Sequence, residues 1–392
     1  MENIARGLEG VVVTETRLSH VDGERGELLI GGFPVEELAP QASFEEMLHL
    51  LWYDRLPDEG ERAALHRELA AQRALPTTTM RLLRDAARHS TPPMDALRMG
   101  VATLSLADPC PGDNSRAAQL HRAVGLVARF TTIVAAYARL AQGCEALAPR
   151  SDLGHVGNYL YMLRGEEPSP AVVRALETYF NTVVDHGMNA STFTARVVAS
   201  TESDMVSALT GAIGALKGPL HGGAPGPALD TVFDIRERTA RSKRPLAEEA
   251  EIRVREIIAG GGRMMGFGHR VYKVRDPRAE VLGGAATRLF ERGGDTRLYD
   301  DAMVVEKVIL HVLHETKPDR RLETNVEFYT ALLLHGVGLD TALFSPTFAV
   351  SRAGGWTAHV LEQFGENRLI RPASLYVGER GRHWVPAPER AA

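Results

Sequence analysis

SFEEMLHLLW, residues 43–52, is the stretch that decides the fold class. Ser43, followed three residues later by Glu46, has the spacing of a capping box, in which two side chains close the start of a helix. Apolar residues then recur at i, i+3, i+4, i+7 and i+8, the spacing of one buried helical face. They are Phe44, Met47, Leu48, Leu51 and Trp52. The spacing predicts a core helix from Ser43 onward, and with it a helical fold.

The same spacing recurs along the chain. It predicts further helices over Val172–Val184 and Asp301–His314, and another helix is expected at Ala228–Ile235, after the segment LHGGAPGP. Ser345 followed by Pro346 predicts another helix start, with serine as the N-cap and proline as the first helical residue. No regular alternation of strands and helices is present, which disfavours a doubly wound sheet.

A small N-terminal hairpin is the only strand feature that the sequence predicts. Residues 10–16 and 26–33 carry the apolar β-formers, and the polar segment DGERG, residues 22–26, has the composition of a turn. We therefore expect an all-α protein with a minor β-hairpin.

Composition and charge disfavour several classes of function. The 392 residues are 44% hydrophobic and 24% charged, which is ordinary for a globular protein with room for two domains. Lys and Arg number 45 against 50 Asp and Glu, so net charge favours neither nucleic acid nor a membrane surface. Cys110 and Cys144 form no CxxC motif, which disfavours a disulfide framework or a thiolate metal site. With no signal-like apolar start and no run of about 18 apolar residues, we expect a cytoplasmic location.

Two histidine neighbourhoods are candidates for chemistry. His221 stands in LHGGAPGP, just before a predicted helix; the positive end of the helix dipole disfavours a protonated imidazole there. A neutral imidazole donates a hydrogen bond to a carbonyl, although a histidine beside an ordinary turn would look the same. The segment Asp185-His186-Gly-Met-Asn189-Ala-Ser191 gathers polar groups at a helix end, where plain capping is the alternative.

The third and fourth candidate segments are basic and acidic. GFGHRVYKVRDPR, residues 266–278, combines glycines with four cations, a pattern suited to phosphate or carboxylate binding or to a solvated turn. It is neither a dinucleotide fingerprint nor a P-loop. Glu327, in NVEFY, is a carboxylate among apolar neighbours at a helix start. Apolar surroundings would raise the pKa of this carboxyl and suit it to act as a base. The alternative is an acidic residue that only stabilises the helix start, through the positive end of the helix dipole.

These segments, in this order, resemble the citrate synthase family nearly from end to end. The remaining similar segments are GLEGVVVTETRLSHVDGERGELLIGGFPVEELA at residues 7–39, SFEEMLHLLWYDRLP at 43–57, NASTFTARV at 189–197, FAVSRAGGWTAHVLEQ at 348–363 and RPASLYVG at 371–378. The resemblance implies an all-α homodimer of two-domain subunits. A large domain would comprise residues 1–221 and 325–392, and a smaller CoA-side domain, residues 222–324, would close over the cleft. Glycine-, proline- and charge-rich segments at residues 217–227 and 317–325 agree with these boundaries.

The resemblance also implies a reaction and roles for residues. Acetyl-CoA and oxaloacetate would condense to citrate and CoA, with acyl-CoA as a substrate and neither a metal nor a tightly bound cofactor. His221 resembles the histidine that hydrogen-bonds the thioester carbonyl, His269 the one that polarises the 2-oxo group, and Glu327 occupies the position of the catalytic aspartate. The groups that resemble oxaloacetate ligands are His186, Arg278, Arg352 and, from the partner subunit, Arg371. Those that resemble CoA-contacting elements are Lys273, Met264, Met265, Gly266 and Gly268.

The chain departs from the commonest family pattern at three motifs. Glu327 stands where aspartate is usual, which adds one methylene to the base. Pro225 and Gly226 replace two polar residues after LHGGA, and DHGMNAST replaces DHELNAST. We therefore expect a divergent member, with rate and substrate choice affected more than the reaction class.

Two alternative functions are also compatible with the sequence. A 2-methylcitrate synthase would use propionyl-CoA, and one methylene in a pocket changes preference by only about 1–3 kcal/mol. A catalytically weak paralogue that binds CoA or a dicarboxylate is the second, disfavoured by the presence of His221, His269, Arg278, Arg352 and Arg371.

Overall fold

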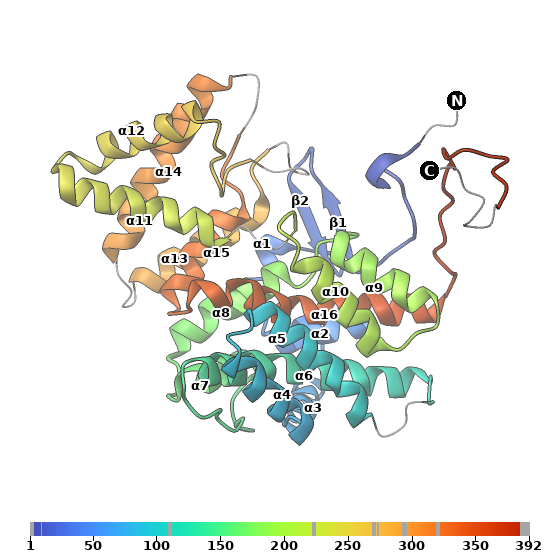
Figure 1. Ribbon diagram of the computed structural model, residues 1–392. Coiled ribbons are helices and arrows are strands. Elements are labelled where there is room, and N and C mark those ends of the chain that lie inside the picture. Colours follow the sequence, from blue (N-terminus) through green and yellow to red (C-terminus); the bar gives the residue numbers. More distant parts are fainter. Residues whose placement is uncertain are drawn as a thin grey trace.

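The protein is predominantly helical (Figure 1). The computed structural model describes residues 4–8, 10–108, 112–221, 225–268, 272, 274–291, 296–318 and 322–384, with only the backbone at residues 225 and 226. The α-helices within these residues are α1 Val35–Leu38, α2 Phe44–Tyr53, α3 Glu59–Ala71, α4 Thr77–Arg88, α5 Pro93–Ala102, α6 Arg116–Ala141, α7 His155–Arg164, α8 Pro170–Val183, α9 Ala190–Ser200, α10 Met205–Leu216, α11 Pro225–Ser242, α12 Leu246–Ala259, α13 Pro277–Glu291, α14 Thr296–Thr316, α15 Val326–Gly336 and α16 Phe344–Gly365. The predicted all-α class is confirmed.

The predicted hairpin is present, but its first strand is not where the sequence placed it. Strands β1 Ser19–Asp22, β2 Glu27–Ile30 and β3 Phe33–Pro34 form an antiparallel sheet in that order. The Asp22 carboxylate accepts hydrogen bonds from the Glu24 and Arg25 amides and closes the turn. A short turn pairs the residues that flank it directly, so residues 19–22 form the strand and the prediction of residues 10–16 was wrong.

One predicted helix cap is confirmed and another is wrong. Ser43 and Glu46 form the complete capping box of α2, as predicted, while Ser169 caps α8, which begins two residues before the predicted helix start at Val172. The N-cap predicted at Ser345 was wrong, because α16 already begins at Phe344. A 3₁₀ turn, η3 Thr341–Leu343, precedes it, and the Asp340 carboxylate caps that turn. The chain is therefore helical before it reaches the serine.

Helix α16 crosses the centre of the larger part of the molecule and packs on α6, α9, α10, α8 and α2 (Figure 1). Two glycines allow this close approach. A Cβ at Gly355 would lie 2.2 Å from the Val184 carbonyl oxygen, and one at Gly354 would lie 2.6 Å from Leu48. The contact at Val184 holds α16 against the C-terminal end of α8.

Helix α6 is long and apolar enough to span a membrane by length and composition alone. In the fold, however, 83% of its most apolar window is buried inside the protein. This is the behaviour of a central core helix.

Helices α11, α12 and α14 pack on one another at one end of the molecule, and α11 also packs on α15 (Figure 1). Helix α13 packs on α14 but also extensively on α8 and α15, so it connects this group to the larger part. The expected small domain, residues 222–324, contains both kinds of helix, and its boundaries stay a prediction. The junction at α8, α13, α15 and α16 is where the candidate residues gather.

Candidate active site

Glu327 lies in the first turn of α15, as the sequence predicted. The Asn325 side chain caps this helix by accepting a hydrogen bond from the Glu327 amide at 2.9 Å. Its amide group donates to the Gly268 carbonyl at 2.7 Å, which fixes the helix start against the glycine-rich segment. The Glu327 carboxylate is therefore held in position through its backbone.

The electrostatic surroundings of Glu327 suit a base at neutral pH. Burial raises the pKa of its carboxyl to about 7, against the opposing effect of Arg278 and Arg352 and with a smaller raising effect from Asp276. Among the residues that the structure describes, the carboxylate has no hydrogen bond or ion pair. A carboxylate with a pKa near the working pH combines basicity with a large deprotonated fraction.

Arg278 and Arg352 bring two buried guanidinium groups to the same place from α13 and α16. Arg278 makes two bonds with Asp276, Nε to Oδ1 at 3.1 Å and Nη2 to Oδ2 at 2.8 Å. Arg352 donates from Nε to the Val183 carbonyl at 2.6 Å and lies over the Phe348 ring. Burial lowers its pKa to about 10, so it remains cationic at neutral pH. Paired guanidinium groups favour a dicarboxylate ligand.

His186 lies just past the end of α8. Its Nε2 is 3.1 Å from the Tyr272 hydroxyl, and the two rings meet edge to face. The Arg278 guanidinium lies 5.7 Å from the same Tyr272 ring centre. Tyr272 therefore links His186 to Arg278, a contact that sequence reasoning did not predict.

A buried chain of hydrogen bonds holds the loop that carries His186. Arg196 donates from Nε to His359 Nδ1 at 3.0 Å, and His359 Nε2 then donates to Asp185 at 3.1 Å. Ser19 donates to the other oxygen of Asp185 and accepts from the Gly187 amide at 2.8 Å. The residues on both sides of His186 are thus fixed from α9, α16 and β1.

His221 is held by the first turn of α9. The Ser191 amide donates to His221 Nε2 at 3.3 Å, and the Ser191 hydroxyl lies 2.8 Å from the same nitrogen. Trp356, on α16, donates to that hydroxyl at 3.2 Å. Since Nε2 accepts from a backbone N–H, which always donates, the proton of the neutral ring is on Nδ1. His221 therefore presents a hydrogen-bond donor.

The neutral His221 expected from the sequence is confirmed in direction, but the cause is different. Burial lowers the pKa of the imidazole to about 4, and the nearby Arg352 cation contributes next. Helix α11 begins at Pro225, and desolvation rather than a helix dipole is the largest cause. The same Arg352 acts on Glu327, so the expected donor and the expected base share one electrostatic environment.

The predicted CoA-side segment lies beside the base. Phe267 pairs with Thr324 in an isolated antiparallel bridge, and Gly268 donates to the Glu323 carbonyl at 2.7 Å. A Cβ at Gly266 would lie 3.1 Å from the Phe328 Cβ, so the segment packs directly on α15. The predicted residues in it are Met264, Met265, Gly266 and Gly268. Their role toward CoA stays a prediction.

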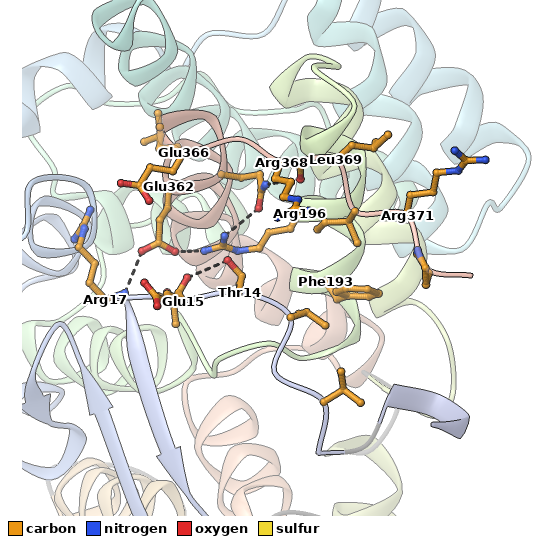
Figure 2. A pocket seen from close by; sticks show the side chains of 18 of the residues that line it. Thr14, Glu15, Arg17, Phe193, Arg196, Glu362, Glu366, Arg368, Leu369 and Arg371 are labelled. Carbon is orange, nitrogen blue, oxygen red and sulfur yellow. Dashed lines mark hydrogen bonds and ion pairs between the residues drawn. The ribbon is translucent and has the colours of Figure 1, made fainter. Parts of the chain in front are cut away.

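Three predicted residues remain to be accounted for. His269 and Lys273 lie outside the described residues. Arg371 lines a separate cavity of about 1220 Å³ between residues 8–17 and residues 361–372. Figure 2 shows the Arg371 side chain pointing away from the buried Arg196–Glu362 ion pair in that cavity.

Several supporting residues carry no distinguishing signal in the sequence. His359, Arg196 and Trp356 stand inside segments that resemble the citrate synthase family, yet nothing in their spacing distinguishes them from core positions. Tyr179, on α8, belongs to the apolar pattern that predicts the buried face of this helix. Their partners are more than 100 residues away in the chain or depend on helix packing.

Comparisons with known proteins identify the family of this chain. Residues 7–373 match the family model described as citrate synthase, C-terminal domain. The chain is 40% identical over 390 residues to a citrate synthase of Haloferax volcanii, covering 99% of both chains. It is also 37% identical to a 2-methylcitrate synthase of Mycobacterium tuberculosis, over 97% of this chain and 92% of that one.

A solved structure leads to the same family. The citrate synthase of Thermoplasma acidophilum, described as a ternary complex with carboxymethyl coenzyme A and oxaloacetate, superposes with a TM-score of 0.88 at 30% identity, covering 100% of both chains. Fold and sequence therefore lead to the same result. This chain belongs to the citrate synthase family.

Proposed function

We propose that this enzyme condenses acetyl-CoA with oxaloacetate and water to give citrate and CoA. The observation that carries the proposal is that Glu327, a carboxyl with a pKa of about 7, and the neutral donor His221 both lie under the electrostatic influence of Arg352. Acyl-CoA is a substrate in this reaction, and no tightly bound cofactor is needed.

The first chemical step is removal of a proton from the acetyl methyl group. A thioester α-proton is far less acidic than a carboxylic acid, and each unit of pKa mismatch costs about 1.4 kcal/mol. Glu327 takes the proton, and the His221 Nδ1–H donates to the thioester oxygen as charge develops there. Without this donor the carboxylate alone does not make the enol accessible.

The second step joins the enol carbon to the 2-oxo carbon of oxaloacetate. Arg278 and Arg352 hold the acceptor carboxylates, and His186 contributes a further hydrogen bond. The family resemblance assigns polarisation of the carbonyl to His269. Hydrolysis of the resulting thioester releases CoA and makes the sequence irreversible.

A homodimer with Arg371 acting across its interface is part of the proposal. Apolar side chains lie exposed on both terminal arms, with Val12 and Val377 each 88% and Trp384 80% accessible. Such side chains are covered in a subunit interface. Co-expression of Arg371→Ala and Glu327→Gln chains tests this, because only a shared site regains activity in the mixed dimer. Activity absent from the mixed dimer contradicts the role across the interface.

A cytoplasmic location is proposed on the low cysteine content alone. Fractionation of cells that express a tagged chain tests it.

The function itself is tested by thiol release from acetyl-CoA and, separately, from propionyl-CoA, each with and without oxaloacetate. Release that depends on oxaloacetate and is faster with acetyl-CoA supports citrate synthesis. Faster release with propionyl-CoA favours 2-methylcitrate synthesis, which the mycobacterial relative makes the second candidate. No release, together with a thermal shift on ligand addition, would indicate a binding protein instead.

A further inference from the structure

The hydroxyl of Tyr179 is a buried polar group that the mechanism above does not use. The residue is fully buried on α8, and its hydroxyl oxygen has no hydrogen-bond partner in the part of the chain that the structure describes. A buried hydroxyl without a partner is unfavourable and rare in native proteins. It therefore needs an explanation, and its location offers one.

Tyr179 belongs to the part of α8 that faces the candidate site. Helix α8 packs on both α13, which carries Arg278, and α15, which carries Glu327. Val183, one helical turn further along α8, accepts the hydrogen bond of Arg352. Residues four apart lie on the same helical face, so Tyr179 and Val183 are neighbours on that face.

The charges around the phenol are those of the site. Glu327 is the charged group that acts on it most strongly, raising its pKa together with burial, while Arg352 and Arg278 act in the opposite direction. The Glu327 carboxylate itself has no hydrogen-bond partner among the described residues. A buried donor without a partner and a half-buried carboxylate that accepts no hydrogen bond from the described residues thus share one electrostatic environment.

A neighbouring buried tyrosine has a hydrogen-bond partner for its hydroxyl, as is usual. Tyr159 is also fully buried, but its hydroxyl lies 2.8 Å from the Thr347 hydroxyl. The rings of both tyrosines approach the Phe180 ring, at 6.1 Å for Tyr159 and 6.3 Å for Tyr179. Two buried tyrosines in the same layer therefore differ in whether their hydroxyl has a structural partner.

We propose that Tyr179 is a positioning residue for the base: its hydroxyl donates a hydrogen bond to the Glu327 carboxylate when substrates fill the site. The proposal rests on the proposed function of Glu327. A hydrogen bond donated to the ionised form stabilises the carboxylate and aims one oxygen, leaving the other for the methyl proton. It also gives a reason for a phenol beside a base that is one methylene longer than aspartate.

Tyr179→Phe tests the proposal, because it removes only the hydroxyl. We expect kcat to fall about 10-fold, the loss typical of one hydrogen bond, with little change in KM. The acidic limb of the kcat profile should move to higher pH, since the carboxylate loses a donor that favours its ionised form. The Tm should stay equal or rise, because an unsatisfied group has been removed.

Tyr159→Phe is the matched control. It deletes a hydroxyl with a structural partner, so Tm should fall while the acidic limb stays in place. Coupling is measured in a double-mutant cycle of Tyr179→Phe with Glu327→Asp, and non-additive effects on kcat are expected.

Three results overturn the proposal: an unmoved acidic limb in Tyr179→Phe, additive effects in the cycle, or a Tm loss like that of Tyr159→Phe. All are measured against a wild-type enzyme that releases CoA in the presence of oxaloacetate. If wild type itself releases none, the proposed function has failed, and the role of Tyr179 falls with it for that separate reason.

Discussion

The two histidines of this site and its carboxylate differ in how many hydrogen bonds surround them. Around His186 and His221 the described polar groups are satisfied: Asp185 is held by His359 and Ser19, and Ser191 holds the His221 ring. These bonds come from α9, α16 and the hairpin, all parts of the larger region of the fold.

The carboxylate side is left open. Glu327 is fixed through its backbone by Asn325, yet its carboxylate has no partner among the described residues, and neither has the Tyr179 hydroxyl. The difference reflects the separate requirements of a hydrogen-bond donor and of a base. Donors that stabilise developing charge act best when they are rigid beforehand. A base must instead be poorly solvated and accept few hydrogen bonds, because each hydrogen bond to its charged form lowers its pKa.

The largest effect is expected from Glu327→Gln, which keeps the shape and removes the base. The kcat should fall about 1,000-fold, within the range for loss of a general base. Stability gives a second signal. The folded protein holds the Glu327 proton up to a pKa of about 7 while the unfolded chain releases it near 4.5, so wild type loses stability as pH rises through that window. The Tm advantage of the variant over wild type should therefore be larger at pH 8 than at pH 5.

His221→Ala is expected to come next, with kcat reduced between about 100- and 1,000-fold, as for a single oxyanion donor. Ser191→Ala sharpens the comparison, because it removes the hydroxyl but keeps the backbone N–H that fixes the ring proton on Nδ1. Its loss of kcat, measured by thiol release, should be clearly smaller. Equal losses would mean that the hydroxyl, rather than the amide, determines the tautomer.

Arg278→Lys should act on binding. The lysine keeps the charge but loses the paired N–H groups that engage Asp276 and a carboxylate, so KM for oxaloacetate should rise about 30-fold. Arg288→Lys, an exposed position on the same helix, is the control and should leave KM unchanged. A change in KM for acetyl-CoA alone would contradict the assignment of Arg278 to the dicarboxylate.

The smallest effect is expected from His359→Asn, which interrupts the chain from Arg196 to Asp185. This residue touches no substrate in the mechanism, so we expect a loss of about 5-fold in kcat/KM for oxaloacetate through a displaced His186 loop. Buried hydrogen bonds are lost as well, so Tm should fall. His311→Asn, exposed on α14, is the control for both measurements.

Local features of this site were predictable from sequence, and long-range ones were not. The capping box at Ser43 and the helix start at Glu327 follow from neighbouring residues, whereas the raised pKa of the Glu327 carboxyl comes mainly from burial in the folded protein. The first strand of the hairpin was misplaced because residues 10–16 have strand composition without a pairing partner in the fold. Tyr179 and His359 look like core positions on helices in the sequence. The polar and charged groups near them are brought there by the packing of α8 against α15 and α16, which the sequence does not show.

The most direct test of the central claim is the pH dependence of kcat/KM for acetyl-CoA at saturating oxaloacetate. The base acts only when deprotonated, so activity should be constant above pH 8 and fall with unit slope as pH decreases through about 7. His221, with a pKa of about 4, stays neutral over this range and adds no limb. A limb centred near 4 to 5, the ordinary value for a glutamate, would contradict a desolvated Glu327 as the base.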